Sequence, residues 1–247
     1  MRSDYRAQGF AVLRGAVAPA LVARLGAAVD RVQAGVATMA PAERARLVLE
    51  RDQPPALRGG VPAEAVGDAI FILGEPSAFD PLFEAVLAEP AVLATARALL
   101  QTEAVVAHFM NVTIKHPRFG SGIRWHRDFP NAYICTEGAD FLRLMLCLDG
   151  MDDDTGATCF LPASHQLSDE AARHEKRNGR RAPVDEQAAV TLRCAPGDLV
   201  AIHPKVLHGG GMNRGARPRR NLVLQVGRAQ AALVTSEREA ITGRLLA

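Results

Sequence analysis

The sequence predicts a mainly β fold, either a barrel or a double-sheet jelly roll, preceded by helices. Up to about residue 100 apolar residues recur at helical intervals, whereas from residue 104 onward short apolar, β-branched runs alternate with turns. Many short strands broken by turns such as Pro196-Gly197-Asp198 are typical of barrels and jelly rolls. A chain of 247 residues is long enough to form such a fold as one domain.

The N-terminal part, about residues 1–103, is expected to be helical after one strand at Gly9–Gly15. Pro19 suits a first helical position, and Leu21, Leu25, Val29 and Val32 follow at intervals of three and four. Further helices are expected over Ala42–Arg51, from Asp80 as N-cap with Pro81 next, and over Ala91–Leu100. Residues 52–68, which contain Pro54-Pro55 and Gly59-Gly60, are expected to form a loop.

The β-barrel core is expected over about residues 104–230. Its clearest strand lies where Leu142, Leu144, Leu146 and Leu148 alternate with other residues, a period of two. The other expected strands are Val105–Ile114, Gly122–His126, Thr158–Leu161, Ala189–Leu192, Asp198–Ile202 and Leu222–Val226. Residues 168–187 are densely charged without apolar periodicity, which predicts a solvated insertion and is compatible with a lid over a site.

Composition and charge argue against several classes of protein. A net charge of +2 gives no support for a nucleic-acid or anionic-membrane partner, and no apolar run approaches the roughly 18 residues of a membrane span. Residues Met1–Tyr5 lack the apolar core of a signal peptide, and the four cysteines show no CxxC spacing. We therefore expect a cytoplasmic protein with free thiols, whose oligomeric state the sequence leaves open.

A candidate metal site is formed by His126, Asp128 and His208. Side chains at i and i+2 of a strand share a face, so His126 and Asp128 offer an imidazole and a carboxylate to one ion. His208 follows 208 − 126 = 82 residues later, which leaves room for several strands before the chain returns. Two His and one carboxylate form the facial triad of non-heme Fe(II) oxygenases, so the sequence indicates an enzyme.

At these residues the chain resembles the phytanoyl-CoA dioxygenase family of iron- and 2-oxoglutarate-dependent oxygenases. Trp125-His126-Arg127-Asp128 is similar to the family's WHxD signature, and Pro162-Ala163-Ser164-His165 to its PGSH turn. Pro196-Gly197-Asp198 through His208-Gly209 resembles the distal-histidine region, and Arg219 follows His208 by 219 − 208 = 11 residues. The resemblance is strongest from about residue 105 to 227. It implies a double-stranded β-helix, a cupin-like jelly roll, as a single oxygenase domain over residues 1–247.

The resemblance also implies the ligands. Fe(II) would be held by the triad, and 2-oxoglutarate and O2 would take the open positions. Arginine pairs bidentately with a carboxylate and stays charged when desolvated, so Arg219 is the expected partner of the far carboxylate of 2-oxoglutarate. Only one of the adjacent Arg219 and Arg220 can face inward. Asn111 and Thr113, polar residues at alternate positions of an apolar strand, are candidates to face the cosubstrate.

The sequence departs from the family pattern at two positions. Many relatives carry a small hydroxyl residue two positions after the distal histidine, where this chain has Gly210, and the residue between the first two ligands is often Gln, where this chain has Arg127. Neither change affects a metal ligand. Both concern carboxylate binding and the support of the ligands.

Three functions remain open from the sequence. The leading hypothesis is a hydroxylase that acts on a C–H bond of a small molecule and releases succinate and CO2. The alternatives are a cupin-like metalloenzyme that does not use 2-oxoglutarate, and a catalytically silent binding module of the same fold. No basic patch suited to coenzyme A is evident, which favours a small, carboxylate-bearing substrate, either amino-acid-like or a natural-product intermediate. The residues expected to approach the pocket are Arg124, Arg143, Phe129, Tyr133 and Asn221.

Overall fold

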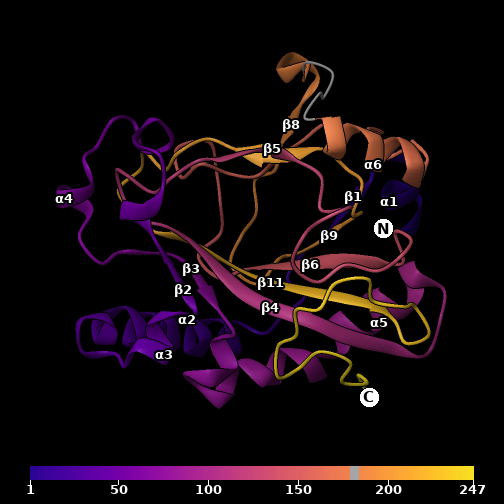
Figure 1. Cartoon of the computed structure of the whole chain (residues 1–247), viewed down its shortest axis with the longest axis horizontal. Helices are drawn as coiled ribbons and strands as arrows, with labels where there is room; N and C mark the ends of the chain where they lie inside the picture. Colours follow the sequence, from indigo (N-terminus) through magenta and orange to yellow (C-terminus); the bar gives the residue numbers. More distant parts are fainter. Residues whose placement is uncertain (179–183) are drawn as a thin grey trace.

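Two antiparallel β-sheets form the centre of the molecule (Figure 1). The computed structural model describes residues 1–178 and 184–247. The larger sheet has the strand order β1-β9-β6-β11-β4-β3-β2, and the smaller sheet has the order β5-β10-β7-β8. The strands are β1 (Phe10–Leu13), β2 (Leu47–Leu49), β3 (Ile70–Gly74), β4 (Val105–Lys115), β5 (Ile123–His126), β6 (Phe141–Cys147), β7 (Cys159–Phe160), β8 (Val190–Thr191), β9 (Leu199–Ile202), β10 (His208–Gly210) and β11 (Arg219–Arg228).

Helices cover the face of the larger sheet that points away from the smaller sheet, with α2, α3 and α5 on that side in Figure 1. The α-helices are α1 (Arg2–Gln8), α2 (Pro19–Gly35), α3 (Pro41–Arg44), α4 (Ala63–Val66), α5 (Pro90–Leu100) and α6 (Asp169–Asn178). The 3-10 helices are η1 (Val36–Thr38), η2 (Glu50–Asp52), η3 (Pro55–Arg58), η4 (Pro76–Ala78), η5 (Pro81–Ala88) and η6 (Glu186–Ala188).

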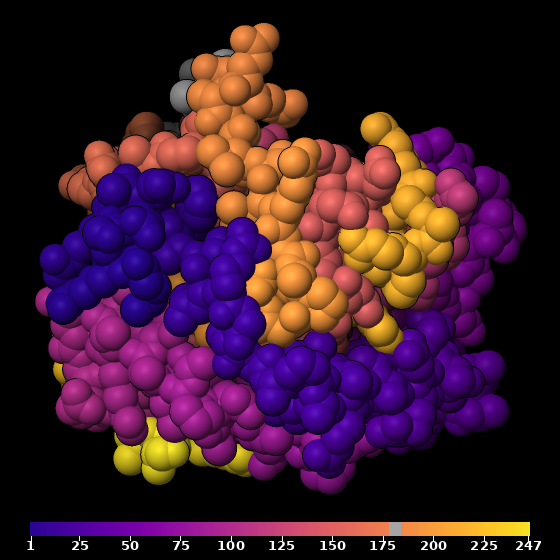
Figure 2. Space-filling model, turned by 180° about the vertical axis from the view of Figure 1, so that it is seen from behind, coloured from indigo at the N-terminus to yellow at the C-terminus, as the bar shows by residue number. Residues whose placement is uncertain are grey.

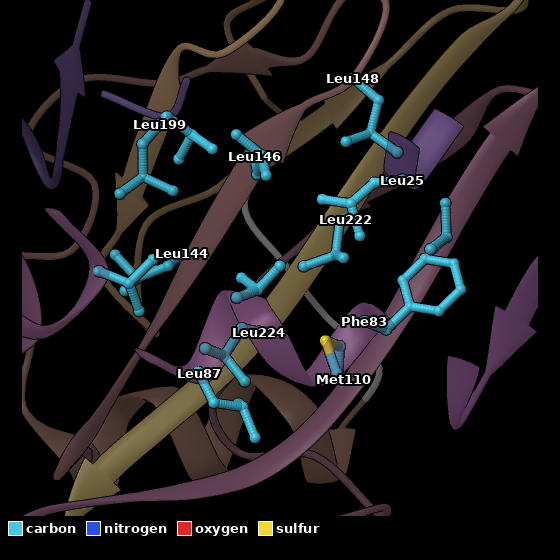
Figure 3. Packing of buried hydrophobic residues seen from close by; sticks show 14 of the residues in the cluster. Leu25, Phe83, Leu87, Met110, Leu144, Leu146, Leu148, Leu199, Leu222 and Leu224 are labelled. Carbon is cyan, nitrogen blue, oxygen red and sulfur yellow. The ribbon is translucent and has the colours of Figure 1, made fainter. Parts of the chain in front are cut away.

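The main hydrophobic core lies between these helices and the larger sheet. Leu25 of α2 and Phe83 of η5 pack in one cluster with Leu222 and Leu224 of β11 (Figure 3). Because side chains alternate along a strand, the residues between these leucines point to the other face, toward the smaller sheet. The larger sheet therefore has one apolar face against the helices and a second face that is free to line a site.

The N-terminal strand forms one edge of the larger sheet and covers the edge of β9. β1 pairs with β9 in antiparallel register, with Phe10 opposite Ile202 and Leu13 opposite Leu199. Figure 2 shows the indigo N-terminal segment lying against the orange chain of that region. Strand β1 thus covers a backbone edge that would otherwise be open to pairing with another chain.

The predicted mainly β jelly roll with N-terminal helices is confirmed by the two stacked antiparallel sheets. The expected strands correspond to β1, β4, β5, β6, β7, β8, β9 and β11, and the expected helices from Pro19 and over Ala91–Leu100 are α2 and α5. Asp80 is the N-cap of η5, since its carboxylate accepts a hydrogen bond from the Leu82 backbone N–H at 2.9 Å. The element that Asp80 begins is a 3-10 helix.

The prediction of a helix over Ala42–Arg51 is wrong. Helix α3 ends at Arg44, and the chain then forms strand β2, which pairs with β3 through Leu47–Leu73 and Val48–Ile72. Pairing with a distant strand outweighs local helix preference here, because Leu49 becomes buried while Val48 stays exposed, the alternation of a half-buried strand. Strand β3 itself was not predicted.

Two other segments differ from the expected structure. The expected loop 52–68 contains the short helical turns η3 and α4, and helix α1 precedes the first strand. The expected insertion 168–187 begins with helix α6, while its residues 179–183 lie outside the described residues. Within the described part of the chain, no helix combines the length and apolar character needed to cross a membrane.

Candidate metal centre and cavity

The candidate ligands His126, Asp128 and His208 meet between the two sheets. His126 ends β5 and His208 begins β10, and the two residues are directly opposite in the antiparallel register. His126 Nε2 lies 3.5 Å from Asp128 Oδ1, and His208 Nε2 lies 3.8 Å from Asp128 Oδ2. One donor atom of each residue lies within 4.8 Å of the other two. The strands therefore bring together the three residues that the sequence singled out.

Backbone carbonyls orient both imidazole rings. His126 Nδ1 contacts the Arg124 carbonyl at 2.8 Å, and His208 Nδ1 contacts the Val206 carbonyl at 3.1 Å. In the tautomer that these contacts favour, Nδ1–H donates and Nε2 keeps its lone pair, as is usual for histidines that bind metals. Burial and the neighbouring His126 lower the pKa of His208 to about 4, so that its ring is neutral near pH 7.

Asp128 supplies a buried carboxylate with unused bonding capacity. Burial by itself would raise the pKa of Asp128, but the positive charge of Arg143, together with the two histidines, holds that pKa well below its ordinary value. Arg143 Nη1 lies 2.5 Å from Asp128 Oδ1 as an ion pair. Neither carboxylate oxygen accepts a well-aligned hydrogen bond from the residues that the structure describes. Buried oxygens of this kind beside two free imidazole nitrogens fit a divalent cation.

The three candidate ligands open into a cavity of about 190 Å³ between the sheets, which His126 and His208 line directly. On the larger sheet its wall consists of residues of β3, β4, β6, β9 and β11. The other lining residues are Phe71, Ile72, Asn111, Thr113, Ile123, Arg143, Met145, Thr158, Ile202, Gly209, Arg219 and Val223. The candidate metal position thus lies beside a mostly apolar chamber with a few polar side chains.

Arg219 lines this cavity and Arg220 does not. Arg219 is 1% exposed, and its Nη2 donates to the Gly156 carbonyl at 3.0 Å, while its Nε has no hydrogen-bond partner among the described residues. Burial lowers the pKa of Arg219 to about 10, so the guanidinium remains charged near pH 7. Arg220 instead forms ion pairs with Asp149 and Asp30, each at 2.6 Å.

Asn111 and Thr113 also face the cavity. Thr113 Oγ1 donates to the Asn221 carbonyl at 3.4 Å, whereas the buried Asn111 Oδ1 has no partner in the described part of the chain. Asn111 therefore offers an acceptor to a bound molecule, while Thr113 is engaged by the adjacent strand. Their roles toward a cosubstrate remain predictions.

Lys115 is a buried basic side chain that the sequence reasoning missed. It stands opposite Arg219 in the β4–β11 register, and its Nζ donates to the carbonyls of Gly156, at 2.8 Å, and Gly211. Burial and the charge of Arg219 lower its pKa well below the ordinary value. The available signal was its place two residues after Thr113, on the same face of the strand.

The structure explains why Gly210 replaces a hydroxyl residue. A Cβ atom at Gly210 would lie 2.6 Å from the Ala157 carbonyl oxygen and 3.3 Å from Lys115 Nζ. A side chain at this position would collide with the Ala157 backbone and would come close to the Lys115 amino group. The glycine at residue 210 is therefore explained by the close approach of the Ala157 carbonyl.

Arg127, the other departure, joins the ligand segment to helix α6. Its Nε donates to Glu175 Oε2 at 2.8 Å, and its Nη1 donates to the carbonyls of Ser164, at 2.5 Å, and Lys205. A second pocket, of about 130 Å³, lies on this side of His126 and is lined by Phe129, Pro130 and three residues of α6, namely Ala172, Glu175 and Lys176. The described part of the expected insertion thus lies beside a candidate ligand.

Of the other residues expected near the pocket, Arg143 lines the main cavity and Phe129 lines the smaller pocket. Arg124 is exposed, and Tyr133 donates through its hydroxyl to Glu239 at 3.0 Å. Phe71 and Ile72 of β3 were missed as lining residues because that strand was not expected.

Comparison with known families gives one match over most of the chain. A family model described as phytanoyl-CoA dioxygenase matches residues 5–221. Among curated proteins, an uncharacterised protein of Mycobacterium tuberculosis is 29% identical over 150 residues, which cover 57% of this chain and 50% of that protein. A probable alpha-ketoglutarate-dependent hypophosphite dioxygenase of Stutzerimonas stutzeri is 27% identical over 138 residues, or 52% of this chain and 47% of that protein. The chain spans about half the length of these curated relatives.

Solved structures share the fold over nearly the whole chain. EctD from S. alaskensis with bound Fe has a TM-score of 0.73 at 20% identity, covering 98% of this chain and 82% of that chain. The epimerase SnoN in complex with Fe3+, alpha ketoglutarate and nogalamycin RO has a TM-score of 0.70 at 18% identity, covering 94% and 84%. At these identities the likeness is one of fold.

Proposed function

Because the chain belongs to the phytanoyl-CoA dioxygenase family, we propose that it is an Fe(II)- and 2-oxoglutarate-dependent oxygenase. We further propose that it hydroxylates a C–H bond of a small, carboxylate-bearing molecule and releases succinate and CO2. The observation that carries this proposal is that His126, Asp128, His208 and the buried Arg219 all belong to one site between the sheets. A metal site alone would not require a buried arginine.

The residues fit the proposed ligands. His126, Asp128 and His208 would hold Fe(II), since they provide two imidazoles and a carboxylate whose oxygens have no hydrogen-bond partner among the described residues. Arg219 would bind the far carboxylate of 2-oxoglutarate, because its buried Nε lacks a partner and its charge has no acidic partner within hydrogen-bond distance among the described residues. Fe(II), 2-oxoglutarate and O2 together supply oxidative decarboxylation and the oxidising power to break a C–H bond.

The chain itself contributes orientation and exclusion of water. Carbonyls of Arg124 and Val206 hold the imidazoles, while Lys115 fixes the glycine segment after His208 to the turn at Gly156. The apolar part of the lining, including Met145, Ile202 and Val223, would shield the reacting C–H bond from solvent. We also propose that residues 1–247 act as one oxygenase domain, since β1, β2 and β3 share the larger sheet with the later strands.

The proposal is tested by anaerobic titration of the Fe(II)-loaded protein with 2-oxoglutarate. Bidentate binding of the 2-oxoacid to Fe(II) gives a weak visible charge-transfer band, which we expect in the wild type and not in the Asp128→Ala variant. Addition of O2 and candidate substrates should then release succinate in parallel with a hydroxylated product, followed by mass spectrometry.

The three functions left open by the sequence give different results in this titration. Iron uptake without the band favours a cupin-like metalloenzyme that does not use 2-oxoglutarate. Failure to take up iron, manganese or zinc favours a silent binding module. Either result contradicts the proposal.

A further inference from the structure

Arg143 is a second cation in the main cavity, partly buried and distant from Arg219. It belongs to the inward face of β6 and stands opposite Gln225 of β11, whereas Arg219 begins the same β11 strand six residues earlier. At about 3.3 Å of rise per residue, roughly 20 Å of strand separate the two positions. The cavity therefore carries a positive charge toward each end.

The guanidinium of Arg143 is held in place from two sides. Its Nε donates to Gln225 Oε1 at 3.3 Å, and its Cζ lies 5.1 Å from the centre of the Phe109 ring. The side chain is 19% exposed. Stacking on an aromatic ring and a fixed Nε contact leave the Nη groups directed at the candidate metal centre. A guanidinium that is fixed in this way can bind a planar oxyanion such as a carboxylate without first being ordered.

The only acidic partner of Arg143 among the described residues is Asp128, at 2.5 Å. Asp128 is also the single carboxylate of the candidate triad. A bound divalent cation would share that carboxylate. The single negative charge of Asp128 would then face the two positive charges of the cation and the one of Arg143, so the protein alone would no longer neutralise Arg143. An uncompensated cation that is largely removed from water is costly, and a bound anion can neutralise it.

The cosubstrate does not account for both cations. In the proposed function the far carboxylate of 2-oxoglutarate pairs with Arg219, and its other carboxylate binds the metal. The rest of the lining near Arg143 is apolar and includes Met145 and Ile202 of the neighbouring inward positions. Among the described residues that line this cavity the cations are Arg219 and Arg143, so an anionic group of a third molecule would find its complementary charge at Arg143.

We propose that Arg143 binds an oxyanion of the substrate, a carboxylate in the first place, and so selects which molecules reach the metal. This inference rests on the proposed function. Binding would transfer one Nη contact from Asp128 to the substrate, while Gln225 and Phe109 keep the guanidinium in place. The substrate would then lie with its charged end at Arg143 and an uncharged carbon beside the metal.

The test uses Mn(II), which replaces Fe(II) without turnover, saturating 2-oxoglutarate, and two small probes of the same shape. Propanoate carries the oxyanion and propanamide does not. Protein-bound Mn(II) accelerates the nuclear relaxation of protons that bind close to it, so NMR reports binding without catalysis. We expect acceleration for propanoate, with affinity at least about tenfold higher than for propanamide.

Three variants make the test specific. Arg143→Gln should weaken propanoate binding by at least about 30-fold, while 2-oxoglutarate affinity stays within about twofold. Mn(II) binding should not weaken, because the substitution removes a positive charge beside the cation. Arg143→Lys keeps the charge and should retain part of the binding. Arg217→Gln, which removes an exposed arginine paired with Asp152, is the matched control and should behave as wild type.

Other outcomes overturn the inference. Equal relaxation by the two probes in the wild type, or unchanged propanoate binding in Arg143→Gln, removes the anion site. If Arg143→Gln weakens Mn(II) binding, the role of Arg143 is to position Asp128. If the variant weakens 2-oxoglutarate binding, Arg143 contacts the cosubstrate and not the substrate. Failure of the wild type to bind Mn(II) or 2-oxoglutarate contradicts the proposed function instead, so that the two failures are distinguishable.

Discussion

On the face of the larger sheet that packs against α2 and η5, β11 contributes Leu222, Leu224 and Val226, all 0% exposed. On the face toward the smaller sheet the same strand contributes Arg219 and Gln225, which are 1% and 0% exposed. The two faces are equally buried but chemically opposite. Burial on the first stabilises the fold through apolar contact, whereas burial on the second requires a hydrogen-bond or charge partner for each polar group.

The difference shows where ligands are expected. On the inner face Gln225 is satisfied, since its Nε2 donates to the Ile134 carbonyl at 2.8 Å. Arg219 Nε, Asn111 Oδ1 and the Asp128 oxygens have no hydrogen-bond partner among the described residues. These atoms all lie at the cavity or at the candidate metal centre. Unsatisfied polar groups on one face of a sheet whose other face is an apolar core therefore mark binding positions.

The largest effect is expected at the metal ligands. Replacement of His126, Asp128 or His208 by Ala should abolish iron binding and succinate release, because each residue supplies one of three protein ligands. Iron stoichiometry and succinate release measure the two losses. A variant at any of these positions with near-normal turnover would show that the cavity beside the inner face does not hold the metal site as assigned.

The next largest effect separates two adjacent arginines. Arg219→Ala should raise the 2-oxoglutarate requirement by a factor that corresponds to about 2–5 kcal/mol, the cost of removing one partner of a desolvated charge pair. Iron should remain bound. Arg220→Ala, the matched control, removes ion pairs with Asp149 and Asp30 outside the cavity and should leave that requirement within a few-fold. If Arg220→Ala raised the 2-oxoglutarate requirement and Arg219→Ala did not, Arg220 would be the residue that faces the cavity.

The helix-facing side should show the opposite behaviour. Leu224→Ala leaves a cavity in the main core and should lower the free energy of unfolding by about 2–5 kcal/mol. Chemical denaturation measures this loss. Because Leu224 points away from the site, Mn(II) and 2-oxoglutarate affinities of the folded fraction should not change. A large change in those affinities at full folding would mean that the two faces are not independent.

The smallest effect is a pH dependence from buried histidines. Burial lowers the pKa of His203 to about 3 and that of His108 to about 4, against 6.5 in an ordinary environment. At a pH between the folded and the ordinary pKa, these histidines bind protons in the unfolded chain but not in the folded chain. The free energy of unfolding therefore rises with pH, and it falls as the pH drops from about 6.5 toward 4. Melting temperatures of the metal-free protein from pH 7 to 4.5 should follow this slope. His203→Asn should make the slope shallower, and an unchanged slope would exclude His203 as a contributor.

Much of the fold could be predicted from short-range patterns. The alternation at Leu142–Leu148, the prolines that begin α2 and α5, and the N-cap Asp80 each depend on residues a few positions apart. Strands β2 and β3 could not be predicted in this way. Leu47–Leu49 follows a short helix and is a strand only because β3 lies beside it, a contact between residues distant in the sequence.

For the candidate site, the spacing of His126 and Asp128, the return of His208 and the pair of adjacent arginines can all be read from the chain, because strand alternation and chain order are local properties. Which of these side chains meet depends on the folded arrangement of the strands. Antiparallel register places His208 opposite His126 and Lys115 opposite Arg219, and it turns Arg143 toward Asp128. Register depends on the pairing of whole strands across a fold, so no local pattern contains it.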